Sequence, residues 1–236
     1  MNQIVLITGA SEGIGREMVR LFAREGAYIG AVARRREQLE TLAHEVGEDR
    51  VLPLAADVRV APDMERAAQQ VMERWGRIDS LVNNAGVAKY VPLTEMTHEQ
   101  FQWQLDVNLK GLFNACKAVV PYMKQQAAAG GPRPAGQILN ISSILGTVGM
   151  PGGTAYCATK WGVIGFSEAL RMELNADGIR VMVLCPGLTQ TDFGGRPASG
   201  KEKGLLPATV AWHALNLLTA PPDALPTTTL LRPAAP

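Results

Sequence analysis

A tyrosine, a lysine and a serine lie at spacings that suit proton transfer to an oxygen atom. Tyr156 and Lys160 are four residues apart, so a helix over this segment places both side chains on one face. A nearby ammonium lowers the pKa of a phenol, which is otherwise about 10 and too high for a fast acid–base group near neutral pH. Such a pair is also common as a surface tyrosine packed on a lysine stem. Ser143, thirteen residues before Tyr156, favours the catalytic interpretation because it follows an apolar segment typical of a buried strand.

A second group of residues has the composition of a phosphate-binding loop. Residues 8–15, TGASEGIG, follow a predicted strand and open a predicted helix. Glycines let the chain turn tightly and let phosphate oxygens approach the backbone, and a helix N-terminus supplies free N–H groups. Glycine is common in plain turns as well, but the position between strand and helix favours nucleotide binding.

The elements that must position these residues alternate along the whole chain. Short apolar segments lie at 4–7, 28–32, 51–54, 80–82, 137–141, 181–184 and 228–231. Helical patterns lie between them at 14–25, 35–46, 61–75, 98–126, 154–176 and 207–219. The apolar segments do not alternate with polar residues, which predicts strands buried on both faces of a parallel sheet. The pattern predicts an α/β fold with a doubly wound sheet of about seven parallel strands and helices on both faces.

The composition excludes several classes of protein. The 236 residues are 47% hydrophobic with a net charge of +1, unlike a disordered chain or a nucleic-acid binder. The three cysteines and three histidines form neither a disulfide framework nor a metal-ligand spacing. The first ten residues do not resemble a signal peptide, and no uncharged apolar run approaches the roughly 20 residues that span a bilayer. We therefore expect a single cytoplasmic domain over 1–236, with no metal and with neither membrane nor nucleic acid as a partner.

Two segments interrupt the alternation of strands and helices. Residues 127–136, AAAGGPRPAG, are expected to form a surface loop. Residues 192–206, DFGGRPASGKEKGLL, contain four glycines and show no periodicity. Loops of this length in compact domains are commonly functional, so 192–206 is the predicted substrate lid.

Several motifs, taken in order, resemble the short-chain dehydrogenase/reductase family. The first is the G-x-x-x-G-x-G spacing of Gly9, Gly13 and Gly15, which differs from the G-x-G-x-x-G of other dinucleotide-binding proteins. The others are Asp57-Val58, Asn83-Asn84-Ala85-Gly86, Asn108, Ser142-Ser143, Tyr156-x-x-x-Lys160 and Pro186-Gly187. The resemblance extends from the first strand to 228–231 and implies a Rossmann-like fold in a single dinucleotide-binding, catalytic domain.

The resemblance implies hydride transfer between a nicotinamide cofactor and a carbonyl group, with four catalytic residues. Tyr156 would be the acid–base residue, and Lys160 would lower its pKa while binding the nicotinamide ribose. Ser143, chosen over Ser142 by its spacing, would hydrogen-bond the substrate oxygen. Asn108 would anchor a water that relays protons to Lys160; its alternative role is that of a buried asparagine at a helix irregularity.

The end of the second predicted strand bears on the choice of cofactor. Ala33 stands where NAD-dependent enzymes place an acidic residue for the ribose 2′-hydroxyl, and Arg34 and Arg35 follow. Arginine binds a 2′-phosphate with a planar fork of donors, so NADP(H) is the expected cofactor. The alternative is that these arginines are only solvated charges at a helix start. Glu12 stands where some NADP-dependent relatives have a basic residue, which removes one phosphate contact.

The remaining site residues follow by position. The predicted cofactor-binding residues are Gly9, Ser11, Gly13, Ile14, Gly15, Arg34, Arg35, Asp57, Val58, Asn84, Ala85, Gly86, Tyr156, Lys160, Pro186, Gly187, Thr189 and Thr191. The predicted substrate-binding residues are Ser143, Leu145, Met150, Tyr156 and Phe193, with Tyr90 and Leu188 also on the wall. These side chains are mainly apolar and supply no fixed cation, which indicates a moderately apolar ketone, aldehyde or secondary alcohol.

Three functions fit this pattern. The first is an NADP(H)-dependent carbonyl reductase or alcohol dehydrogenase. The second is a 3-oxoacyl-[acyl carrier protein] reductase, for which Arg196, Lys201 and Lys203 supply only a thin basic docking surface. The third is a non-catalytic NADPH-sensing regulator, a class that often loses the tyrosine or the lysine.

Two long helices predict self-association. The helices at 106–126 and 155–176 are more apolar than one buried stripe requires and include Phe113, Trp161 and Phe166. In the family these helices form subunit interfaces, so we expect a homo-oligomer, either a tetramer or a dimer.

Overall fold

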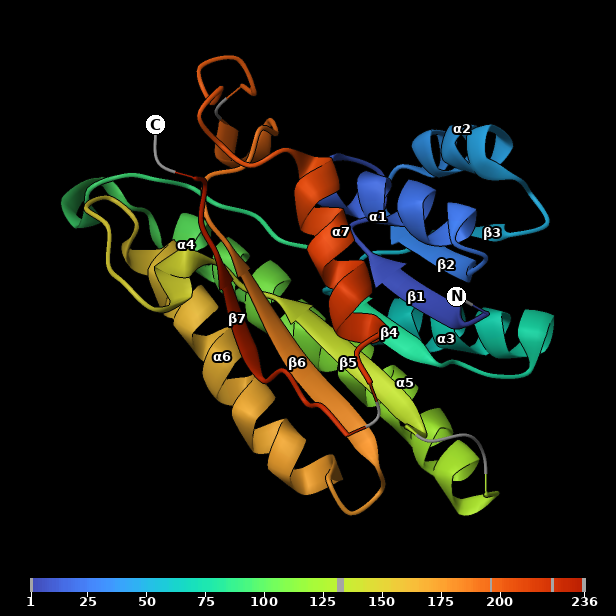
Figure 1. The fold of residues 1–236 in the computed structure, drawn as a ribbon. Coiled ribbons are helices and arrows are strands. Elements are labelled where there is room, and N and C mark those ends of the chain that lie inside the picture. The colour runs from blue at the N-terminus through green and yellow to red at the C-terminus, as the bar shows by residue number, and fades with distance from the viewer. Residues whose placement is uncertain (1, 131–133, 196, 222, 235–236) are drawn as a thin grey trace.

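The computed structural model describes residues 2–130, 134–195, 197–221 and 223–234. Within these residues the chain forms one parallel sheet of seven strands in the order β3-β2-β1-β4-β5-β6-β7 (Figure 1). The strands are β1 Ile4–Thr8, β2 Tyr28–Ala33, β3 Val51–Ala55, β4 Ser80–Asn83, β5 Gly136–Ile141, β6 Ile179–Pro186 and β7 Thr228–Leu231. This confirms the predicted doubly wound α/β sheet, in which the strand order reverses direction between β1 and β4.

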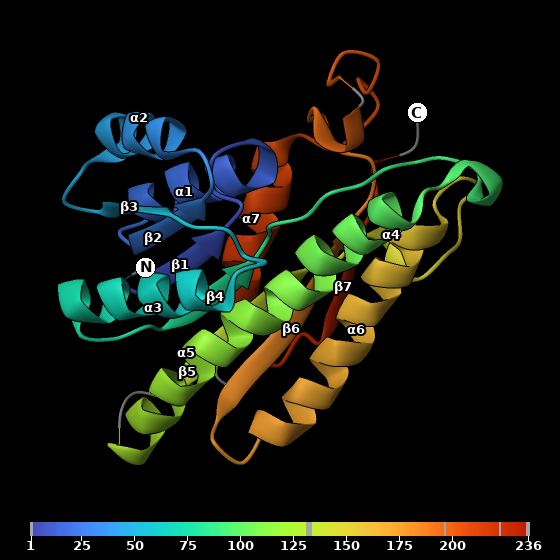
Figure 2. The same ribbon diagram turned by 180° about the vertical axis from the view of Figure 1, so that it is seen from behind.

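Helices cover both faces of the sheet. They are α1 Gly13–Arg24, α2 Arg36–Val46, α3 Ala61–Trp75, α4 His98–Leu105, α5 Gly111–Ala128, α6 Thr154–Leu174 and α7 Pro207–Leu218. One core joins α1, α2 and α7 to strand residues such as Val5 and Ile7, and a second joins α3, α5 and α6 to residues such as Leu6. The second set of helices faces the viewer in Figure 2. Alternate residues of each central strand therefore enter opposite cores, which explains their continuous apolar character.

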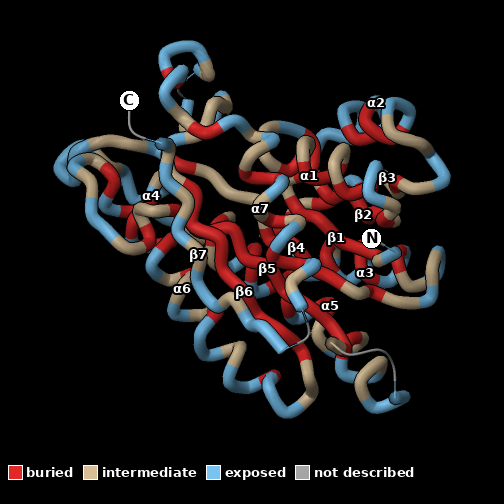
Figure 3. Tube along the Cα trace, viewed as in Figure 1, coloured by how far each residue is buried: buried red, intermediate tan, exposed pale blue. Residues whose placement is uncertain are grey.

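Burial follows this arrangement except at the two edges. The central strands are buried along their length in Figure 3, whereas β7 alternates between exposed and intermediate residues and β3 has two intermediate residues and one exposed residue. The prediction that all seven strands are buried on both faces is wrong for β7 and in part for β3. As the end strands of the sheet, each pairs with one neighbour only.

The predicted helix over 98–126 is wrong in one respect, because it is interrupted. α4 ends at Leu105, a π-helical turn covers Asp106–Lys110, and α5 then runs from Gly111 to Ala128. A π-turn inserts one residue into a helix, so the apolar pattern continues through it with a change of phase. The other predicted element bounds differ from the observed ones by at most two residues.

The two segments between regular elements are partly ordered by neighbouring structure. In the predicted loop 127–136, α5 continues to Ala128 and β5 begins at Gly136; residues 131–133 lie outside the described residues. In the predicted lid, Phe193–Gly195 forms a short helical turn and Leu205 bridges back to Thr189. Arg196 lies outside the described residues.

Neither a membrane span nor a metal cluster is found among the residues that the structure describes. No helix in these ranges is both long and apolar enough to cross a bilayer. The same ranges contain no group of three or more histidine, cysteine or acidic side chains placed to hold a metal ion.

Candidate active site

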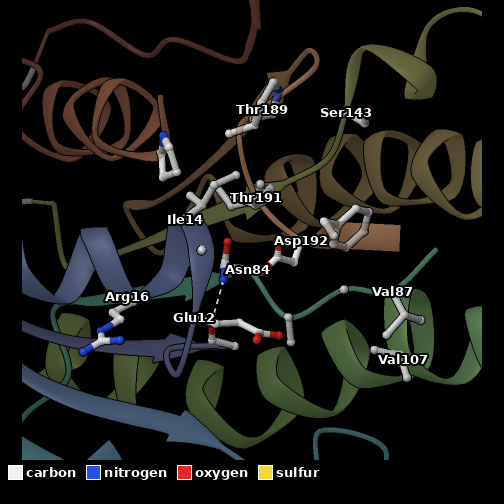
Figure 4. Close-up of a pocket in the computed structure, with 18 of the residues that line it drawn as sticks. Glu12, Ile14, Arg16, Asn84, Val87, Val107, Ser143, Thr189, Thr191 and Asp192 are labelled. Carbon is white, nitrogen blue, oxygen red and sulfur yellow. Dashed lines mark hydrogen bonds between the residues drawn. The ribbon is translucent and has the colours of Figure 1, made fainter. Parts of the chain in front are cut away.

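A cavity of about 720 Å³ lies at the carboxyl ends of the central strands. It is lined by the 8–15 loop, by residues after β2, β3 and β4, by Ser143 and Tyr156, and by the segment after β6. Figure 4 shows part of this lining, including Ile14 of α1 and Thr191 of the segment after β6. The carboxyl edge of an open parallel sheet is where such folds bind ligands.

Nearly all the residues predicted for the site line this one cavity. The cofactor and substrate residues named from the sequence are on its wall with the exception of Gly15, and of the catalytic four only Asn108 is not on it. Tyr90 and Leu188 line it as well. Side chains separated by up to 180 residues of sequence are thus brought together as expected.

Gly15 acts behind the loop rather than on the cavity wall. A Cβ atom on Gly15 would lie 2.1 Å from the Gly9 carbonyl oxygen and 2.6 Å from Asn84 Nδ2. Gly9 itself has a φ of +68°, a conformation that glycine adopts readily. The absence of a side chain at Gly15 lets the loop fold onto the first turn of α1, which directs the free N–H groups of that turn toward the cavity.

Asn84 fixes the loop from the side of β4. Its Nδ2 donates hydrogen bonds to the carbonyl oxygens of Thr8 and Gly9, each at 3.1 Å. The backbone N–H of Asn84 in turn donates to Thr8 Oγ1. Figure 4 shows the Asn84 side chain beside the loop. The residue predicted to line the cofactor ribose therefore also holds the phosphate loop in shape.

Ser143 and Tyr156 meet on a buried part of the cavity wall. Ser143 is 7% exposed and Tyr156 is 5% exposed. The Tyr156 ring packs edge-on to Tyr90 with centroids 5.6 Å apart, and lies 5.8 Å from the Phe193 ring. Ser142, the alternative to Ser143, donates its hydroxyl to the Lys160 carbonyl oxygen at 2.9 Å. This bond engages Ser142 with the backbone of α6, which supports the choice of Ser143.

Burial dominates the electrostatics of the two proton-active groups. It raises the pKa of the Tyr156 phenol well above its ordinary value, and the interaction with Ser143 only partly opposes this. It lowers the pKa of Lys160 from 10.5 to about 8. The net shift of the Tyr156 pKa is therefore upward, and the lowering of this pKa by Lys160 stays a prediction. Lys160 Nζ lies 5.7 Å from the centre of the Tyr156 ring and donates to the Ile141 carbonyl oxygen.

The depressed Lys160 pKa predicts a pH limit on carbonyl reduction. Above a pH of about 8 the amine becomes neutral and no longer stabilises the tyrosinate left after proton donation. We expect kcat for reduction to fall as pH rises through this value, measured as a pH–rate profile at saturating cofactor. Lys160→Arg keeps its charge and should remove the fall. A decline centred near 10.5 in the unmodified protein would contradict the assignment.

Asn108 occupies the centre of the π-turn and is almost fully buried. Its Nδ2 donates to the Val87 carbonyl and to Thr159 Oγ1, both at 2.9 Å, and its Oδ1 accepts from the Val87 N–H at 2.8 Å. Thr159 then donates to the Tyr156 carbonyl at 2.8 Å. Asn108 thus ties the segment after β4 to the catalytic turn of α6, as its alternative role at a helix irregularity predicts.

The predicted relay role of Asn108 has a geometric counterpart at Gly86. A Cβ atom on Gly86 would lie 3.5 Å from Asn108 Oδ1 and 3.6 Å from Lys160 Nζ. The amide oxygen and the ammonium therefore approach the same point, and glycine keeps that point open. Asn108 and Lys160 therefore approach each other beside Gly86, which lines the cavity.

The part of the cavity lined by residues after β2 and β3 contains an ion pair that sequence spacing did not indicate. Arg35 NH2 lies 2.6 Å from Glu12 Oε2 and 3.3 Å from Ser11 Oγ. Asp57 is held by Arg59 at 2.6 Å, and the charge of Arg34 contributes to lowering the Asp57 pKa. Both predicted phosphate ligands, Arg34 and Arg35, line the cavity, but the carboxylate of Glu12 engages Arg35.

Several lining residues were missed by the sequence reasoning. Trp103 and Val107 face the cavity from α4 and the π-turn, and their four-residue spacing on an expected helix would have revealed a shared face. Val87 lies beside Val107 in Figure 4. Lys201 lines the cavity and is 8% exposed. The expectation that the substrate wall supplies no cation is therefore wrong. Lys201 had no sequence signal, because the position depends on the path of an irregular segment.

Comparison with known proteins places this geometry among described enzymes. Residues 3–201 match the model of a family described as short chain dehydrogenase. A 3-oxoacyl-[acyl-carrier-protein] reductase from Thermotoga maritima is 37% identical over 206 residues, which cover 86% of this chain and 81% of the relative.

Two solved structures share nearly the whole fold. An alcohol dehydrogenase from the archaeon Thermococcus sibiricus, complexed with 5-hydroxy-NADP, has a TM-score of 0.89 and 32% identity, and the match covers 100% of this chain and 99% of that one. A 3-ketoacyl-(acyl-carrier-protein) reductase from Brucella melitensis, complexed with NADH, has a TM-score of 0.91 and 29% identity, with 98% and 97% covered.

Proposed function

The chain belongs to the short chain dehydrogenase family, and from the contents of its cavity we propose an NADP(H)-dependent oxidoreductase that interconverts a ketone or aldehyde with an alcohol. The observation that carries the proposal is the position of Ser143, Tyr156 and Lys160 on the wall of the cavity that also holds the phosphate loop. A proton donor, its supporting cation and a dinucleotide site thus open onto one space.

The residues present fit a nicotinamide dinucleotide. The N-terminus of α1 opens onto the cavity, and glycines at 9 and 15 leave no side chain in the way of the loop. When bound there, the cofactor supplies or accepts the hydride. The phosphate loop would hold its diphosphate, and Lys160 would hold the nicotinamide ribose.

Tyr156 performs the proton transfer in this proposal. In reduction its phenol donates a proton to the carbonyl oxygen as negative charge develops there, and in oxidation the tyrosinate accepts that proton. Ser143 hydrogen-bonds the same oxygen and stabilises the charge that develops on it. Charged Lys160 stabilises the tyrosinate, and its approach to Asn108 beside Gly86 gives the returning proton a route to the catalytic pair.

The preference for NADP(H) rests on this chain's own arginines. Of the two similar solved structures, one contains NADH and the other an NADP derivative. Similarity to them therefore does not distinguish NAD(H) from NADP(H) as the cofactor of this chain. Arg34 and Arg35 both line the adenine end of the cavity, where Ala33 stands in place of an acidic residue. Guanidinium groups bind a 2′-phosphate strongly and gain nothing comparable from a 2′-hydroxyl.

Removing the Glu12 carboxylate should sharpen that preference. Glu12→Gln releases Arg35 and removes a negative charge beside the expected 2′-phosphate, so we expect KM for NADPH to fall about two- to fivefold with little change for NADH. Glu40→Gln, which breaks the exposed pair of Glu40 with Arg36, is the matched control and should change neither KM. Equal or weaker NADPH binding by Glu12→Gln would show that Arg35 does not contact the phosphate.

The substrate end of the cavity is apolar and aromatic. Tyr90, Trp103 and Phe193 surround the approach to Tyr156, together with Leu145, Met150 and Leu188. We infer that a moderately apolar ketone, aldehyde or secondary alcohol binds here. Aromatic rings on two sides of Tyr156 favour a flat or extended group next to the carbonyl.

The second candidate is a 3-oxoacyl-[acyl carrier protein] reductase. The names of similar proteins favour it, but the basic residues of the predicted lid do not. Of the basic residues expected to dock an acidic carrier, Lys201 is buried against the cavity and Lys203 is exposed. Arg196 lies outside the described residues. The sensing regulator is disfavoured because Tyr156 and Lys160 are both present and share the cavity.

We further propose that the protein is a homo-oligomer, a tetramer or a dimer. Phe113 of α5 and Trp161 of α6 are 46% and 54% exposed, so both helices present a large aromatic side chain at the surface. A size-exclusion series over protein concentration tests this, and a monomer at every concentration would overturn it.

Oxidation of NADPH and of NADH, followed against a panel of ketones, aldehydes, diketones and 3-oxoacyl thioesters, tests the proposed function. Turnover that is faster with NADPH supports it. Tight NADPH binding without turnover on any panel member would favour the sensing regulator. Turnover confined to acyl thioesters and improved by carrier protein would favour the acyl reductase.

A further inference from the structure

Lys201 is a buried lysine on the predicted lid. It is 8% exposed and lines the cavity. Its ammonium donates to the carbonyl oxygen of Thr191 at 2.5 Å and to that of Phe193 at 3.3 Å. Lysine is among the residues least often buried, so its position on a cavity wall calls for a role there.

These two bonds place the ammonium beside the phosphate loop. Thr191 lies directly over Gly13, since a Cβ atom on Gly13 would be 3.2 Å from Thr191 Cγ2. Gly13 begins α1, whose first turn presents its free N–H groups to the cavity. Lys201 thus approaches from the lid the place where α1 approaches from the sheet.

Arginines near the phosphate loop are engaged by carboxylates. Arg16 and Arg20 both pair with Glu45, and Arg35 pairs with Glu12. These three side chains line the cavity, and the carboxylates partly compensate their charges. A cation that the lid brings to the inner side of the loop would complement the helix N-terminus, because a diphosphate carries two negative charges.

We propose that Lys201 binds the diphosphate of the cofactor, so that the lid and the N-terminus of α1 hold it from two sides. This rests on the proposed use of a nicotinamide dinucleotide. It adds a cation to the backbone N–H groups of the phosphate loop. The Thr191 carbonyl holds the ammonium on the side of Thr191 that lies near Gly13.

Lys201→Met tests the proposal by equilibrium binding of NADPH. We expect the dissociation constant to rise about 10- to 100-fold, the range for loss of a charge-assisted hydrogen bond. Lys201→Arg should recover most of the affinity, and Lys203→Met, an exposed lysine of the same segment, should bind as the unmodified protein does. Adenosine 2′-monophosphate, which has no diphosphate, should bind all four proteins equally.

Two further measurements separate a phosphate contact from a merely structural role of Lys201. Affinity for NADPH should depend less steeply on salt in Lys201→Met, and inorganic pyrophosphate should compete with NADPH less well. Loss of affinity with unchanged salt dependence would mean that Lys201 only holds the lid together, and would overturn the proposal.

Measurements of NADPH binding also distinguish a failure of the Lys201 proposal from a failure of the proposed function. Binding of NADPH by Lys201→Met at the unmodified affinity overturns this proposal alone. Failure of the unmodified protein to bind any nicotinamide dinucleotide overturns the proposed function and this proposal together. Unchanged NADPH affinity, with KM raised for a keto acid but not for its neutral ester, would assign Lys201 to a substrate carboxylate instead.

Discussion

Tyr156→Phe is expected to lower kcat for carbonyl reduction by about 10²- to 10⁴-fold, the usual contribution of a positioned general acid. The substitution removes one hydroxyl and keeps the ring. The packing against Tyr90 and Phe193 should therefore persist, together with the shape of the cavity. The loss would come from the missing proton at the developing alkoxide. Steady-state kinetics with the best carbonyl of the panel measures it.

Cofactor binding separates this effect from a general loss of structure. The phenylalanine variant should bind NADPH with a dissociation constant within about twofold of the unmodified protein, because no contact to the phosphates or to Lys160 is removed. Tyr90→Phe, which also removes a phenol from the same aromatic group, is the matched control and should keep most of kcat. Activity of Tyr156→Phe within tenfold of the unmodified enzyme would exclude Tyr156 as the proton donor.

Gly15→Ala is expected to have the largest effect on folding and on cofactor binding together. The added Cβ would lie 2.1 Å from the Gly9 carbonyl oxygen, a distance that only backbone movement can relieve. Overpacking of this kind costs about 3 kcal/mol or more, so the melting temperature should fall by roughly 6–12 °C. The displaced loop should also weaken NADPH binding, by about tenfold or more, below the melting temperature.

Gly165→Ala is the matched control for this substitution. Gly165 is also inside a helix, α6, and its Cβ position has no neighbouring atom within 4 Å. Alanine there should stabilise the helix by about 0.5–1 kcal/mol and leave cofactor affinity unchanged. An unchanged melting temperature and NADPH affinity in Gly15→Ala would mean that the loop does not pack against α1 as described.

The fold was predictable because the apolar segments that form its central strands can be recognised in the sequence one at a time. Each central strand is buried on both faces, so segments such as 4–7 and 181–184 are apolar throughout and stand out from the helices between them. Order along the chain and short connections then restrict the topology to a doubly wound sheet. The burial of the edge strands β3 and β7 was not predicted correctly, since apolar residues such as Leu230 occur there without full burial.

The lining of the site was largely predictable, but its internal interactions were not. Residues such as Ser143 and Thr191 follow strands at the edge where parallel sheets bind ligands, so topology alone brings them together. The pair of Arg35 with Glu12 joins side chains 23 positions apart and depends on rotamers that no periodicity encodes. The burial of Tyr156 and Lys160 likewise depends on the packing of neighbouring elements, which is why the direction of the Tyr156 pKa shift was not foreseen.

The π-helical turn at Asp106–Lys110 changes which side of the helix faces the sheet between α4 and α5. An extra residue in a turn rotates the preceding part of a helix by about 100° relative to the part that follows. α4 can therefore present Trp103 to the cavity while α5 keeps Val119 and Met123 against the sheet. A regular helix over the same residues cannot satisfy both surfaces at once. Removal of a single residue from the turn would redirect the side chains that enclose the substrate while every residue on the opposite wall stayed the same.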